Sequence, residues 1–224
     1  MTVWARITET VSGIGDSISH LIGFGHDTPP EKTMAFTVGM IALGAKMAKA
    51  DGVVTEAEVK AFSDVFHVPL KDQPAVERVF NLAKQDVAGF ESYAGQVAKL
   101  FTPKSSVLES VLDGLFHIAK ADGVIHQEEL LYLQSVAEIF GFVNGDFARI
   151  RSRHVSLRDD PYEILGLTPG VSLPDIKKRY KTLVRELHPD KQIAAGVPPE
   201  MVKLATDRLS KINNAYGALE KELA

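Results

Sequence analysis

The sequence predicts an all-α protein with an N-terminal arm and two helical domains. Its 224 residues are 45% hydrophobic and 24% charged, a composition and length typical of one or two globular domains. Three observations favour helices. Apolar residues recur at helical spacing from residue 31 to about 155, and no run there alternates apolar and polar residues as a strand would. A helix-loop-helix segment occurs twice, and the last part of the chain has the start and stop signals of a helical hairpin.

Composition and motifs exclude several classes of function. The chain has no cysteine, which excludes disulfides, cysteine-ligated zinc, iron–sulfur clusters and thiol nucleophiles. It also lacks the phosphate-binding, zinc-protease, serine-hydrolase and dinucleotide motifs, and its seven histidines show no metal-ligand spacing. We therefore expect a protein that is not an enzyme and needs no cofactor, apart from the divalent cation discussed below.

Charge and hydropathy bear on location and partners. Residues 1–157 hold 14 basic and 19 acidic residues, and residues 158–224 hold 11 and 10. Neither part has the strongly basic balance typical of nucleic-acid-binding domains, so a nucleic-acid partner is not expected. No apolar run approaches the roughly 18 to 20 residues of a transmembrane helix, so a cytoplasmic protein is expected.

Residues 1–28 are predicted to form an amphipathic N-terminal arm. Apolar residues at spacings of three and four define one helix face: Trp4, Ile7, Val11, Ile14, Ile18 and Leu21. Arg6 is the lone basic residue of the arm, whereas membrane-surface helices usually carry several. We expect the arm to pack on its own domain or on a second copy in a homodimer. Peripheral contact with the cytoplasmic face of a membrane is the alternative.

Residues 31–155 contain an internal duplication. The sequence AKADGVVTEAEV at 48–59 recurs as AKADGVIHQEEL at 119–130. Pseudo-symmetry of two such loops would bring four carboxylates together, and clusters of oxygen ligands suit calcium or magnesium. The candidate metal ligands are Asp51, Glu58, Asp122 and Glu129.

Helix capping is the competing explanation for the repeated loop, and the one we favour. Thr55 and Glu58 have the T-x-x-E spacing of a capping box, and Gly52 suits the end of the preceding helix. In the second copy His126 takes the cap position and Glu129 remains. The spacing of the acidic residues excludes an EF-hand.

The paired K-A-D-G-x-[VI] loops resemble those of TerB-like domains, a fold named for tellurite-resistance proteins. This resemblance implies a wholly helical domain over residues 31–155. It also implies divalent-cation binding through acidic residues.

A short basic stretch follows this domain, with the sequence FARIRSRHVSLR. Its charged members are Arg149, Arg151, Arg153, His154 and Arg158. Such runs usually form a solvated helix end or linker, which is the expectation here. A nucleic-acid contact through residues 149–158 is the weaker alternative.

The C-terminal segment begins with two helix starts. Asp160, Pro161 and Glu163 have the arrangement of an N-cap, a first-turn proline and an acidic third residue, and this short helix should end near Gly166. A second helix is expected from about Leu173 to Leu187. One of its faces is apolar, and the opposite face is basic: Lys177, Lys178, Lys181 and Arg185.

His188, Pro189 and Asp190 follow directly. Proline has no N–H and disfavours a helical residue before it, so the second helix must end here and present the tripeptide on an exposed turn. A loop, a third helix over about 200–213 and a short tail helix near Tyr216 are expected next. The third helix should pack back through Met201, Leu204, Leu209 and Ile212.

The order DPYEILGL, basic helix, HPDK and KINNAYGAL resembles a J-domain over residues 159–224. The resemblance implies that His188, Pro189 and Asp190 engage a DnaK-type chaperone and trigger its ATP hydrolysis. It also implies that Lys177, Lys178, Lys181 and Arg185 dock on an acidic surface of that chaperone.

The combination of a TerB-like domain and a C-terminal J-domain resembles the DjlA family of membrane-associated co-chaperones. That family's best-known form begins with a transmembrane segment, which residues 1–28 do not resemble. The function expected from this likeness is a specialised co-chaperone whose helical domain directs an unknown client, location or regulation. The alternative is a divalent-cation-responsive stress or envelope-signalling module.

Overall fold

The computed structural model describes residues 7, 29–47, 60–64, 68–85, 89–155, 160–197 and 202–223. Within these ranges the regular elements are helices and no strand occurs, which confirms the all-α prediction. The elements are α3 (Pro29–Met47), η1 (Leu70–Asp72), α5 (Gln73–Gln85), α6 (Phe90–Lys99), α7 (Ser106–Ala119), α8 (Gln127–Ile139), α9 (Asn144–Val155), α10 (Pro161–Leu165), α11 (Leu173–Leu187), α12 (Pro189–Ala194) and α13 (Lys203–Leu223).

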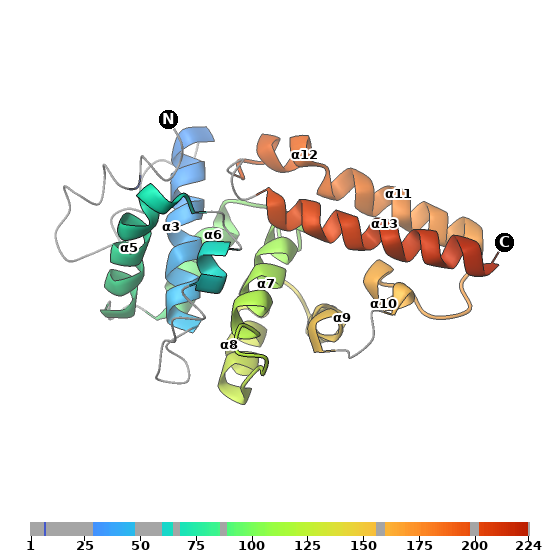
Figure 1. The fold of residues 1–224 in the computed structure, drawn as a ribbon, viewed down its shortest axis with the longest axis horizontal. Coiled ribbons are helices and arrows are strands. Elements are labelled where there is room, and N and C mark those ends of the chain that lie inside the picture. Colours follow the sequence, from blue (N-terminus) through green and yellow to red (C-terminus); the bar gives the residue numbers. More distant parts are fainter. Residues whose placement is uncertain are drawn as a thin grey trace.

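The first domain, α3 to α9, is built around α3, which packs against α5, α6 and α7 (Figure 1). The described side chains of α3 are almost all buried, as expected for a helix that is apolar on every side. Two glycines permit this close packing. A Cβ at Gly39 would lie 2.5 Å from Val97 of α6, and one at Gly44 would lie 2.9 Å from Phe62.

The C-terminal domain consists of α10 to α13, with α11 and α13 side by side and α10 against them (Figure 1). Its helix starts follow the predicted signals. Asp160 accepts a hydrogen bond from Tyr162 N at 2.8 Å, and Ser172 caps α11. The hairpin core of this domain comprises Leu165, Ile176, Leu183, Leu187, Ala205, Ile212, Ala215 and Leu219.

Helix α7 is shared between the two domains. Eleven of its 14 residues are buried, because it packs on α3, α8 and α9 in the first domain and on α11 and α13 in the C-terminal domain. The C-terminal domain therefore rests directly on the first domain.

Two predictions about the C-terminal segment were wrong. Residues 189–194 form helix α12, where a loop was expected, because Pro189 sits at a favoured first position and His188 caps the new helix. The expected third and tail helices are one helix, α13, since its apolar residues continue on one face through Gly217. Leu204 packs on the first domain and contributes nothing to the hairpin core, and Met201 lies outside the described residues.

The N-terminal arm lies outside the described residues except for Ile7, which is buried in the core of the first domain. Its predicted amphipathic helix and its homodimer or membrane contact stay predictions. Among the described helices, none has the length and hydropathy needed to cross a bilayer.

Candidate functional site

The His-Pro-Asp turn, residues 188–190, joins α11 to α12 and lies at the surface. His188 ends α11 and caps α12, and its Nδ1 accepts a hydrogen bond from Asp190 N at 3.2 Å. The side chains of His188 and Asp190 are 54% and 88% exposed. Both polar groups are thus accessible to a partner, while Pro189 restricts the backbone between them.

The predicted basic face lies on the outer side of α11. Ile176, Leu183 and Leu187 of this helix are buried in the hairpin core. The residues that form the basic face are all exposed: Lys177, Lys178, Lys181 and Arg185. Arg185, the last residue of the basic face, lies three residues before His188, so the C-terminal end of the basic face adjoins the His-Pro-Asp turn.

An ionic cluster joins the two domains behind this surface. Glu109 Oε1 of α7 lies 2.9 Å from Arg149 Nη1 and 2.8 Å from Arg208 Nη2 of α13, and it also contacts Arg153. One turn along α7, Asp113 Oδ1 lies 2.8 Å from His154 Nε2. The full ionic cluster is Glu109, Asp113, Arg149, Arg153, His154 and Arg208.

The expectation of a solvated basic stretch after the first domain was therefore wrong for part of it. The side chain of Arg153 is only 9% exposed, and the ring of His154 stacks on Phe116 with centroids 4.7 Å apart. Arg151 is exposed as expected, and Arg158 lies outside the described residues. The two carboxylates of α7 draw the inner residues of the stretch into the interface.

A sequence signal for this cluster existed but was missed. Glu109 and Asp113 are four residues apart in the otherwise apolar helix SVLESVLDGLFHIA, so they lie on one face of a helix that is buried. Buried carboxylates are nearly always paired. Such a pair predicts cationic partners, although it does not say which ones.

Electrostatics keep both carboxylates ionised. Burial alone would raise the pKa of Glu109, but the charges of Arg208, Arg153 and Arg149 outweigh burial and lower this pKa to about 2. Burial likewise opposes ionisation of Asp113, whose pKa is nevertheless held well below its usual range by Arg153 and Arg208 and by the hydrogen bond with His154. Both carboxylates are thus ionised near neutral pH.

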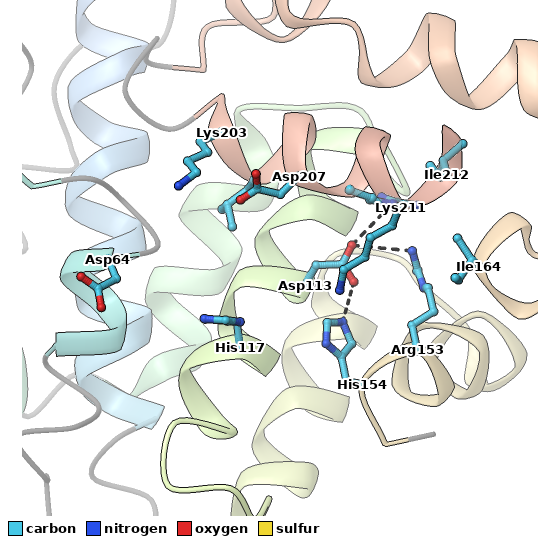
Figure 2. A pocket seen from close by; sticks show the side chains of 12 residues that line it. Asp64, Asp113, His117, Arg153, His154, Ile164, Lys203, Asp207, Lys211 and Ile212 are labelled. Atoms are coloured by element: carbon cyan, nitrogen blue, oxygen red, sulfur yellow. Dashed lines mark hydrogen bonds and ion pairs between the residues drawn. The ribbon is translucent and has the colours of Figure 1, made fainter. Parts of the chain in front are cut away.

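A cavity of about 340 Å³ lies beside the ionic cluster, between α13 and the α7 and α9 helices (Figure 2). Asp113, Arg153 and His154 face it from the first domain, and Asp207 and Lys211 face it from α13. Its walls carry both signs of charge, so they define no single class of charged ligand.

The structure gives the described candidate metal ligands local roles. Glu129 is buried and accepts a hydrogen bond from His126 N at 2.8 Å, which is the capping interaction predicted for it. Exposed Asp122 accepts a hydrogen bond from Val124 N at 3.0 Å. In the part of the chain that the structure describes, no three His, Asp or Glu side chains are grouped to hold a metal ion. Asp51 and Glu58 lie outside it, so the four-carboxylate site stays a prediction.

Comparison with known proteins covers nearly the whole chain. Residues 37–152 match the family model of tellurite resistance protein TerB, and residues 160–223 match that of the DnaJ domain. No solved structure matches the chain significantly.

Curated relatives share both parts. Co-chaperone protein DjlA of Coxiella burnetii is 31% identical over 78% of this chain and 73% of its own length. The proteins of the same name from Photobacterium profundum and Escherichia coli (strain K12) are 27% and 23% identical, over 89% and 86% of this chain and 83% and 81% of their own lengths. With a TerB domain followed by a J-domain, and an exposed His-Pro-Asp turn beside a basic helix face, the chain belongs to the DjlA family of J-domain co-chaperones.

Proposed function

We propose that this co-chaperone binds a DnaK-type chaperone through the basic face of α11 and stimulates its ATP hydrolysis through the His-Pro-Asp turn. The observation that carries the proposal is the joint exposure of the basic face along α11 and of the His-Pro-Asp turn that follows the same helix. The rear of the J-domain, by contrast, is packed on the TerB domain.

The basic face has no evident role in folding. Lys177 and Lys181 are four residues apart, as are Lys181 and Arg185, and like charges at this spacing cost a few tenths of a kcal/mol per pair. A concentrated positive surface raises the rate of encounter with an acidic partner and orients it. The basic face is therefore suited to docking.

The chemistry of the turn suits a triggering contact. The Asp190 carboxylate can accept charge-assisted hydrogen bonds from an arginine or lysine of the partner. His188 offers a ring nitrogen to the partner, since its Nδ1 is engaged with Asp190 N. Neither side chain can perform hydrolysis alone, so the proposed role is to bias the chaperone and not to act on ATP.

The proposed contact with the chaperone does not require the J-domain to separate from the TerB domain. The basic face and the His-Pro-Asp turn are exposed while the ionic cluster is intact. We infer that the full chain is active without release of the J-domain, and that the TerB domain directs client, location or regulation. The proposal implies a cytoplasmic location, where a DnaK-type partner would be met.

Single-turnover ATP hydrolysis by a DnaK-type chaperone tests the proposal. The full chain should accelerate hydrolysis, and the variants His188→Gln and Asp190→Asn should lose most of this acceleration. Their melting temperatures are measured alongside, because His188 also caps α12 and loss of a cap costs about 0.5 to 2 kcal/mol. Lys99→Gln, at an exposed position on α6 of the TerB domain, serves as the matched surface control. Equal acceleration by wild type and His188→Gln would contradict the proposal.

Calorimetric titration tests the cation-responsive alternative. Millimolar calcium, magnesium and zinc are added to the full chain and to Asp122→Asn. No structural observation on the described residues favours this alternative, and absence of binding would remove it.

A further inference from the structure

At the C-terminal end of α11, the backbone carbonyl of Glu186 lacks the hydrogen-bond donor that a continuing helix would supply. In a continuing helix Glu186 O would accept a hydrogen bond from Asp190 N, four residues on. Here that N–H bonds to His188 Nδ1 at 3.2 Å, because Pro189 has ended the helix. The Glu186 carbonyl therefore needs substitute donors.

Two side chains supply them, one from each domain. Gln192 Nε2, from α12, donates to Glu186 O at 3.0 Å. Ser106 Oγ, from the first turn of α7 in the TerB domain, donates to the same oxygen at 3.1 Å. The carbonyl that closes α11 is thus held partly by the TerB domain.

The two donors are also bonded to each other. Gln192 Nε2 also donates to Ser106 Oγ at 3.1 Å, so Ser106, Gln192 and the Glu186 carbonyl form a triangle of hydrogen bonds. Gln192 is only 2% exposed, and a buried amide of this kind is costly unless every group is paired. Gln192 lies two residues beyond Asp190 along the chain.

Apolar contacts hold the other end of α12 in the same way. Val197 and Val202 are buried in the hydrophobic core of the TerB domain, and Ala195 packs against it. No described residue of α12 belongs to the hairpin core of the J-domain. The segment that follows the His-Pro-Asp turn is therefore anchored in the neighbouring domain.

We propose that Ser106 and Gln192 are positioning residues through which the TerB domain holds the His-Pro-Asp turn in the conformation that triggers the chaperone. The inference rests on the proposed function and deepens it. Neither residue need touch the chaperone, because they act on the backbone at Glu186 and on α12. The TerB domain then contributes directly to the activity of the J-domain, in addition to any role in choosing clients.

Full-chain variants in the ATP-hydrolysis assay test this inference. Ser106→Ala and Gln192→Leu each remove donors of the triangle, whereas Ser106→Thr keeps the hydroxyl. Ser135→Ala is the matched control, because Ser135 Oγ bonds within its own helix to Leu131 O at 3.0 Å. Hydrolysis is measured across co-chaperone concentrations to separate maximal stimulation from half-saturation.

Maximal stimulation should fall roughly tenfold in Ser106→Ala and Gln192→Leu, because small displacements of a trigger group cost rate steeply. The half-saturating concentration should stay unchanged, since the basic face is intact. Ser106→Thr and Ser135→Ala should behave as wild type. Unchanged maximal stimulation in both donor variants would overturn the inference, including when their melting temperatures are lowered, since that result shows a structural role only.

A second readout needs no chaperone. In NMR spectra of the full chain, Ser106→Ala should shift the backbone amide signal of Asp190 and the side-chain amide signals of Gln192, and it should speed hydrogen exchange in α12. Unshifted signals would overturn the inference. If wild type fails to stimulate hydrolysis, the proposed function fails, and the NMR result alone then decides whether Ser106 holds the turn.

Discussion

Arg208 of the J-domain and Glu109 of the TerB domain form a buried ion pair, with Nη2 and Oε1 2.8 Å apart. The two residues lie 99 positions apart in sequence, and their contact connects α13 to α7. Each side chain is about one-tenth exposed, so solvent screens the pair far less than a surface salt bridge. The docking of the two domains thus depends on buried charge as well as on apolar contact.

Arg208→Met should destabilise the full chain strongly. Removing one partner of a buried ion pair costs about 3 to 5 kcal/mol, and the value here should lie near 3 because Arg149 and Arg153 still contact Glu109. Urea unfolding measures the loss. Arg151→Met, at an exposed position of the neighbouring helix α9, should change stability by no more than about 0.5 kcal/mol. Equal stability of the two variants would show that the ion pair contributes nothing.

Stability should fall as the pH drops from about 4.5 toward 2. The pKa of Glu109 is about 2 in the folded protein against an ordinary value of 4.5, and a lowered pKa means that the folded state favours the ionised form. Its contribution is present above pH 4.5 and is lost as the pH falls through the folded value. The difference corresponds to at most about 3 kcal/mol.

Scanning calorimetry at several pH values measures this loss. Glu109→Gln removes the titrating group, so its melting temperature should depend less steeply on pH over this range than that of wild type. Asp113 remains and titrates in the same direction, so some dependence should persist. Parallel curves for the two proteins would contradict the assignment.

Gly166→Ala and Gly95→Ala should change stability in opposite directions. Gly166 ends α10 with φ at 68°, and an alanine Cβ there would also lie 3.2 Å from Arg149 Cδ. The left-handed conformation alone costs about 1 to 2 kcal/mol for an L-residue. Gly95 lies inside α6 with open space around its Cβ position, so alanine should add about 0.5 to 1 kcal/mol. Thermal unfolding of both variants measures the signs.

Binding of a DnaK-type chaperone should weaken with salt and with Lys181→Glu. The basic face acts through charge, so its contribution is screened as ionic strength rises. Calorimetry at several salt concentrations should show a lower affinity and a shallower salt dependence for Lys181→Glu. The same reversal at Lys99, on the TerB domain, should leave both unchanged. A salt-independent affinity of the wild type would rule out docking by the basic face.

Glu129→Ala should destabilise the protein to the same extent in the presence and in the absence of divalent cations. The carboxylate caps α8 through His126 N, and loss of a cap costs about 0.5 to 2 kcal/mol. Melting temperatures are measured with and without millimolar calcium or magnesium. A cation that bound the folded wild type would raise its melting temperature, and an increase seen in wild type but not in the variant would point to a metal site instead.

Local signals explain which elements the sequence predicted well. The bounds of α11 follow from Ser172, which caps its start, and from Pro189, which forbids its continuation. Each signal acts within one helical turn, so no knowledge of neighbours is needed. The same proline is also the first residue of α12, a favoured position for proline. Its role as a helix stop gave no indication of this second helix.

The sequence by itself determined the helical class, the J-domain hairpin, the exposed His-Pro-Asp turn and the basic face, because periodicity, caps and proline act over a few residues. Only the tertiary structure decided how the two domains meet. Burial of Arg153 and Arg208 with Glu109, and the bridge from Ser106 to Gln192, join residues 40 to 100 positions apart. No local pattern encodes such pairings, since they arise when packed helices exclude water and each buried charge or amide must find a partner.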